Sequence, residues 1–178
     1  MSSVRPTPPG PAAGNEAGEI DAQGDVATLT FRRYLRHPPA VVWDAITDPA
    51  QIRHWFMTEA RIEGRKGGTV DLVTGPYRVH STGRIVEWDP PFVYEYEWNL
   101  PPSSTAPKGE ASRVRWELSP VEQGTLLVLT HRKLRTETAI VFSRGLRTFL
   151  NRLAAQLDGT PLPEWSHPPG DPDGSPSP

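Results

Sequence analysis

The stretch that most constrains this fold is Val41–Phe56, which reads VVWDAITDPAQIRHWF. Its apolar residues recur at helical spacing, so each half of the stretch has one apolar face. Asp48-Pro49 separates the halves, because proline disfavours the helical conformation in the residue before it and suits the first turn of a following helix. We therefore expect two short amphipathic helices that close one end of a curved sheet.

Strands make up most of the remaining pattern. Thr28–Leu35 alternates apolar and polar residues, and six similar segments separated by Gly-containing or Pro-containing turns follow the two helices. With no helices between those six strands, the sheet should be antiparallel. Thr136–Asp158 has apolar residues three and four apart and is followed by Gly159, which predicts a long helix. The six strands are expected at Thr58–Glu63, Thr69–Thr74, Tyr77–Trp88, Val93–Trp98, Arg113–Leu118 and Thr125–His131.

This order predicts an α+β fold. A bent, seven-stranded antiparallel sheet would wrap around the C-terminal helix, with the two short helices between strands 1 and 2. The 178 residues are enough for one domain, expected at 27–165. Residues 1–26 and 166–178 are polar and rich in proline, so we expect them to be disordered, solvated tails.

Composition excludes several classes of function. The chain has no cysteine, which removes disulfides and thiolate sites. Its net charge is −2, and residues 27–165 carry 18 bases against 15 acids, a surplus too small to indicate a nucleic-acid partner. No apolar run is long enough for a signal peptide or a membrane span, so we expect a cytoplasmic protein. The five histidines lack metal-ligand spacing, and no Gly-x-Ser-x-Gly hydrolase motif occurs. We therefore predict no metal, no cofactor and no catalytic residue.

Aromatic residues are concentrated on one face of two predicted strands. Tyr94, Tyr96 and Trp98 alternate with glutamates, and Trp116 alternates with charged residues in the next strand. The rings should therefore point into the sheet's interior while the charges point to water. Such rings either line a ligand cavity or pack as a solid core.

Several short motifs in one order resemble the SRPBCC superfamily of START-like, Bet v-like helix-grip proteins. Within it, the chain is most similar to the branch named after the activator of the heat-shock protein 90 ATPase. The resemblance covers Ala27–Gly159. It is carried by Arg33, VVWDAITDP with Trp55-Phe56, Gly67-Gly68, Gly83-Arg84-Ile85, Asp89-Pro90-Pro91, Tyr96-x-Trp98, Gly124 to His131 and the Leu-rich last helix.

This resemblance implies a helix-grip fold with a cavity between sheet and last helix that holds an apolar ligand in many relatives. It implies no reaction, because lipid carriers, polyketide cyclases, hormone receptors and co-chaperones share the fold. Relatives in this branch often have Gly-Trp near the start of the last helix. This chain has Gly145-Leu146 there, so the shape of the pocket cannot be carried over.

Helical residues complete the apolar part of the candidate cavity. Phe142, Leu146 and Phe149 lie on the apolar face of the last helix. Trp55 and Phe56, at the end of the short helices, either guard the entrance or belong to the core.

Two polar residues are also candidates. Arg33 interrupts an apolar strand face, where it could bind a ligand anion or pair with an acid such as Glu59, Glu87 or Glu117. His131 ends the last strand and could exchange a proton or hydrogen bond with a ligand carbonyl, or simply cap the strand. The pattern of that strand does not decide which of its faces is buried.

Three hypotheses follow. A non-enzymatic binding module for an apolar or aromatic small molecule, which we favour, should enclose several hundred Å³, within the range of about 300–1,000 Å³ for ligand pockets. A cyclase, aromatase or dehydratase would need two convergent polar groups from among Arg33, Tyr96 and His131. A co-chaperone should expose an interaction surface. The co-chaperone hypothesis has the least support, because residues 1–26 are too short for the N-terminal domain that eukaryotic activators carry.

Overall fold

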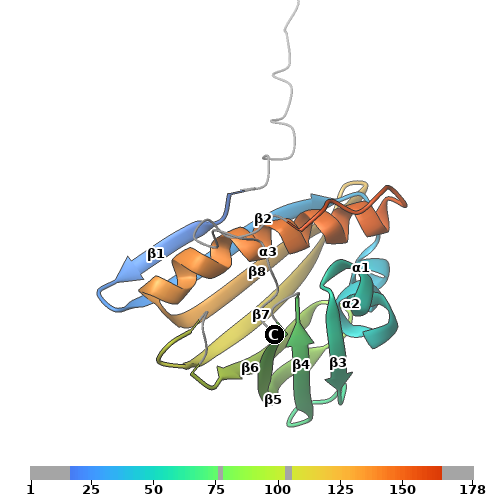
Figure 1. Ribbon diagram of the computed structural model, residues 1–178. Coiled ribbons are helices and arrows are strands. Elements are labelled where there is room, and N and C mark those ends of the chain that lie inside the picture. Colours follow the sequence, from blue (N-terminus) through green and yellow to red (C-terminus); the bar gives the residue numbers. More distant parts are fainter. Residues whose placement is uncertain (1–16, 76–77, 103–105, 166–178) are drawn as a thin grey trace, which may run out of the picture.

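The computed structural model describes residues 17–75, 78–102 and 106–165. In these residues one bent antiparallel sheet curves around a long C-terminal helix, α3, with two short helices at one end (Figure 1). The strand order is β1-β2-β8-β7-β6-β5-β4-β3. The predicted α+β helix-grip architecture is therefore confirmed.

The elements follow the predicted segments closely, with ends that differ by a few residues. The predicted start of one strand, Tyr77, lies outside the described residues. The elements are β1 (Glu19–Gln23), β2 (Val26–Leu35), α1 (Pro39–Thr47), α2 (Pro49–Trp55), β3 (Thr58–Ile62), β4 (Thr69–Thr74), β5 (Val79–Asp89), β6 (Val93–Leu100), β7 (Glu110–Val121), β8 (Gly124–Arg135) and α3 (Thr136–Leu157).

Strand β1 was not predicted, and it makes the sheet eight-stranded in the described part of the chain. It lies within residues 1–26, which the sequence assigned to a solvated tail, and pairs antiparallel with β2. All five β1 residues are exposed, so the strand has no buried face and no alternating pattern to reveal it. Backbone pairing along the edge of β2 holds it in place. The rest of both predicted tails, 1–16 and 166–178, lies outside the described residues.

Helices α1 and α2 form the predicted pair between the first long strand and β3. Asp48 caps α2, since its carboxylate accepts a hydrogen bond from the Ala50 amide at 2.9 Å. The indole of Trp55 donates to the Ala45 carbonyl at 2.8 Å and so joins the two helices. The ring of Trp43 meets that of Trp88 at 5.0 Å, which attaches the pair to the sheet. This part of the interior is filled by aromatic rings.

Helix α3 lies across the concave face of the sheet and buries Ala139, Leu150 and Leu153 there. Arg152 on this helix donates to the carbonyls of Trp55 and His54, at 3.0 and 2.9 Å, and to that of Pro163. One guanidinium therefore connects α3, the end of α2 and the segment that follows α3.

The convex face of the sheet carries a network of charged side chains. Glu95 accepts hydrogen bonds from Arg115, at 2.8 Å, and from Arg132, and Arg115 also contacts Glu87 and Glu117. Burial opposes ionisation of Glu95, but the two arginines outweigh it and lower the pKa of this carboxyl group. The sequence predicted that Glu95 points to water. It does point away from the core, but arginines from neighbouring strands cover it and leave 3% of its surface exposed.

Candidate functional site

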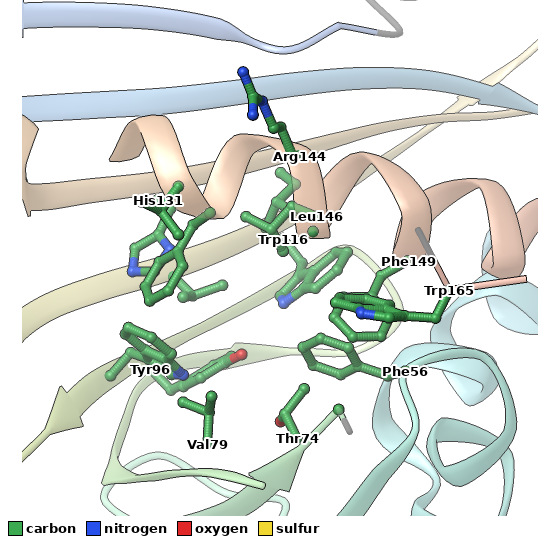
Figure 2. A pocket seen from close by; sticks show the side chains of 17 residues that line it. Phe56, Thr74, Val79, Tyr96, Trp116, His131, Arg144, Leu146, Phe149 and Trp165 are labelled. Atoms are coloured by element: carbon green, nitrogen blue, oxygen red, sulfur yellow. The ribbon is translucent and has the colours of Figure 1, made fainter. Parts of the chain in front are cut away.

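A cavity of about 120 Å³ lies between α3 and the concave face of the sheet (Figure 2). Its walls are almost entirely aromatic and aliphatic, and they come from β4 to β8, from α3 and from Phe56 at the end of α2. The volume is smaller than the several hundred Å³ expected for a binding module.

Eight of the eleven candidate residues line this cavity. They come from separate elements that the fold brings together. They are Phe56, Tyr96, Trp98, Trp116, His131, Phe142, Leu146 and Phe149.

Trp55 and Tyr94 lie behind the wall of this cavity, in the filled end of the interior. Trp55 stacks on Phe56 at 4.9 Å, and Tyr94 stacks on Tyr96 at 4.8 Å. Both border only a void of about 10 Å³, which is too small for a ligand. Of the two hypotheses for Trp55, entrance or core, the structure therefore supports core.

Arg33 does not line the cavity either. It is 7% exposed on the inward face of β2, with its guanidinium 5.4 Å from the centre of the Phe31 ring and a hydrogen bond to the Arg32 carbonyl. The acids named as possible partners pair elsewhere, Glu59 with Arg78 and both Glu87 and Glu117 with Arg115.

The register of the sheet places two polar candidates in one row. Tyr96 of β6 is opposite Val114 of β7, which is opposite His131 of β8. Leu127, Leu129 and His131 are the buried set in β8, which answers the question that the strand's pattern left open. Tyr96 and His131 thus face the cavity two strands apart, a separation of about 9.6 Å along the sheet. Of the three polar groups named for an enzyme, these two line the cavity.

His131 is held in an aromatic corner. Its ring meets the Trp98 ring edge-on at 5.0 Å, and Phe142 lies against both. The Nε2 atom is 2.8 Å from the Ser112 hydroxyl oxygen, which in turn donates to the Trp98 carbonyl at 3.0 Å. Burial lowers the pKa of His131 to about 3, so the imidazole is neutral at physiological pH.

The Tyr96 hydroxyl is the second polar group in the wall and points toward the middle of the cavity in Figure 2. Burial raises the pKa of this phenol, while a hydrogen bond from the Trp116 side chain acts in the opposite direction. Tyr96 is therefore protonated at neutral pH. The Thr74 hydroxyl also belongs to the wall and is 3.1 Å from that of Thr58.

Trp165 forms part of the wall and was not among the candidates. It follows the end of α3, and its ring lies 4.7 Å from that of Phe149 and within 3.4 Å of where a Gly145 β-carbon would sit. Its indole nitrogen is buried and has no hydrogen-bond partner in the described residues. The signal for this residue in the sequence is a tryptophan six positions after Gly159, in an otherwise proline-rich segment.

The described residues contain neither a cluster of metal ligands nor a helix that could span a membrane. No group of three histidine, aspartate or glutamate side chains within 17–75, 78–102 and 106–165 could hold a metal ion. No helix in these ranges combines the length and the apolar character needed to cross a membrane.

Comparison with known families identifies the domain. The family model described as "Activator of Hsp90 ATPase homolog 1-like protein" matches residues 36–158. The chain belongs to this family. The expected place in the SRPBCC superfamily is confirmed. The matched range includes every cavity-lining residue except Trp165.

Solved structures show the same fold. The crystal structure of CalU16 from Micromonospora echinospora has a TM-score of 0.65 and 23% identity, covering 82% of this chain and 85% of that one. The solution structure of CalU16 has a TM-score of 0.64 and 26% identity, and the match covers 83% of this chain and 74% of that one. The crystal structure of protein MLL2253 from Mesorhizobium loti has a TM-score of 0.66 and 24% identity, and the match covers 76% of this chain and 99% of that one. A search of curated proteins found no match.

Proposed function

We propose that this protein binds a small, largely apolar molecule, most simply one with an aromatic ring, in the cavity between α3 and the sheet. The observation that supports the proposal is the aromatic composition of the cavity wall. Aromatic side chains from four elements, including Phe56, Trp98, Trp116 and Phe149, surround a space that none of them fills. Aromatic walls with a few polar groups are typical of sites for small organic ligands.

The energetic cost of the cavity supports an occupant. Protein interiors are close-packed, and an unfilled space costs about 24 cal/mol per Å³. The cavity, of about 120 Å³, borders the exposed side chain of Val141, so its cost is below the roughly 3 kcal/mol of a sealed void of that size. A ligand that fills the space restores the lost contacts and stabilises the folded state by an amount that grows with the logarithm of its concentration.

The volume limits the size of that ligand. An engineered apolar cavity of about 150 Å³ holds benzene, so the cavity in this protein matches a single ring. Trp165 belongs to the wall but not to the sheet or to a helix, and moving its ring outward would admit a larger molecule.

A titration with toluene, followed by NMR of the protein, tests the proposal. We expect saturable, one-to-one shifts of signals from the lining residues. Leu146→Trp should fill the cavity and abolish binding. Ile140→Trp is the matched control, because Ile140 is on the same helix, is 53% exposed and does not line the cavity. Shifts that do not saturate, or that survive in Leu146→Trp, would refute the proposed site.

A further inference from the structure

We infer that the cavity selects a ligand that donates a hydrogen bond, such as a phenol, and that Nδ1 of His131 accepts this bond. The inference rests on the proposed function and adds the chemistry of the ligand's polar end. It depends on Ser112, His131 and the aromatic corner that encloses them.

Ser112 determines which nitrogen of His131 carries the proton. Its hydroxyl has one hydrogen, and the Trp98 carbonyl, 3.0 Å away, can only accept. The hydroxyl oxygen must therefore be the acceptor in its 2.8 Å contact with His131 Nε2. A neutral imidazole has one N–H group, so Nε2 holds it and Nδ1 is a bare acceptor.

The neutral form of His131 follows from its surroundings. The imidazole is packed against Trp98 and Phe142, and burial strongly disfavours its protonated form. The other ionisable side chains in the cavity wall are Tyr96, which is protonated at neutral pH, and Arg144, whose guanidinium points away from the cavity in Figure 2. Nδ1 therefore stays an acceptor across the physiological range.

We place the free ring nitrogen, Nδ1, at the cavity that His131 borders. Within the described residues no hydrogen bond reaches it. Buried side-chain atoms that lack both a partner and accessible surface there are the Tyr94 hydroxyl, Gln156 Oε1 and Trp165 Nε1. Nδ1 is not one of these, which fits an atom with some surface open to the cavity that His131 borders. An acceptor in so apolar a wall favours a ligand with one donor and a flat apolar body.

Phenol and toluene test this inference, since they have nearly the same shape and differ by a hydroxyl in place of a methyl group. The measured quantity is the ratio of the toluene Kd to the phenol Kd, obtained by NMR titration at neutral pH. His131→Phe should lower this ratio about three- to tenfold, the factor expected for one hydrogen bond, while toluene still binds. Ser112→Ala should lower it less, because it leaves His131 in place but frees the choice of tautomer.

Tyr96→Phe tests the competing assignment, because it removes the other hydroxyl that points into the cavity. The inference requires a smaller loss of the preference for phenol in this variant than in His131→Phe. A preference lost in Tyr96→Phe and kept in His131→Phe would overturn the inference. If neither toluene nor phenol binds the unaltered protein, the proposed function itself fails, whereas equal ratios in all variants refute only the role of His131.

A measurement on the unaltered protein avoids any effect of substitution on folding. Long-range proton–nitrogen NMR correlations distinguish the two neutral tautomers of a histidine. We expect the Nε2–H form for His131 without ligand, and a change in the Nδ1 chemical shift when phenol, but not toluene, is added. The Nδ1–H form would contradict the assignment.

Discussion

The two ends of the interior differ although aromatic residues line both. At the end closed by α1 and α2, the rings of Trp43, Trp88 and Tyr94 are 5.0 to 6.4 Å apart and leave a void of about 10 Å³. At the other end, beneath the first half of α3, Trp98 and Phe142 stand apart from the opposite wall around about 120 Å³. We refer to these as the filled end and the open end.

Strand β6 passes through both ends, which makes the comparison instructive. Tyr94, Tyr96 and Trp98 alternate without interruption and point to the same side. Tyr94 is enclosed because α1 supplies Trp43 opposite it, whereas Trp98 faces only Phe142 and His131 before the cavity begins. Whether an inward ring belongs to core or to a cavity wall thus depends on what other elements bring to it.

The largest difference in unfolding free energy should be between substitutions of two leucines that lie one helical turn apart on α3. Leu150 is 1% exposed and lines neither void, whereas Leu146 borders the open end. Leu150→Ala should cost about 2–5 kcal/mol of unfolding free energy, and Leu146→Ala less than half of that, because a side chain beside a cavity has fewer contacts to lose. Chemical denaturation measures both. Equal losses would mean that the open end is packed in solution.

Acid unfolding tests whether the open end excludes water. An unfolded histidine takes up a proton below pH 6.5, whereas His131 in the folded protein does so only near pH 3. Its contribution to stability is therefore present above pH 6.5 and is lost as the pH falls toward 3. At 1.36 kcal/mol per unit, the loss should be on the order of 3 kcal/mol at pH 4.

The control for acid unfolding is His131→Phe, which should lose correspondingly less stability over the same pH range. Parallel curves of unfolding free energy against pH for the two proteins would show that water reaches the imidazole and that its pKa is not lowered.

The smallest changes in unfolding free energy should come from removing the hydroxyls of two tyrosines on β6. Among the described residues the buried Tyr94 hydroxyl has no hydrogen-bond partner, so Tyr94→Phe should leave stability unchanged or raise it by up to about 1 kcal/mol. Tyr96→Phe should lose about 0.5–1.5 kcal/mol, because its phenol interacts with the Trp116 side chain. Thermal and chemical unfolding of both variants test this order, and a larger loss for Tyr94→Phe would contradict it.

Sequence patterns were sufficient for the architecture, because strand alternation and helical periodicity are local properties. They placed Tyr96, Trp98 and Trp116 on the inner face, and the structure puts all three in the cavity wall. They did not distinguish these rings from Tyr94, because that difference depends on Trp43, which is distant in sequence.

Three other features were beyond local patterns for different reasons. Strand β1 buries neither face, so only its backbone pairing defines it. The role of Ser112 depends on cross-strand contacts with Trp98 and His131. Arg33 lies over Phe31 on the same strand and outside the cavity wall, and two of the acids named for it, Glu59 and Glu87, pair with Arg78 and Arg115.

Among the described residues of the cavity wall, Trp165 alone lies outside the range 36–158 that the family model matches. It sits on a short segment after Gly159, fastened to α3 through Arg152 and the Pro163 carbonyl. An insertion or deletion in this segment would bring a different side chain to the wall without disturbing any strand pairing. Under the proposed function, variation in this short C-terminal segment would change the size of molecule that the cavity admits while the sheet stays the same.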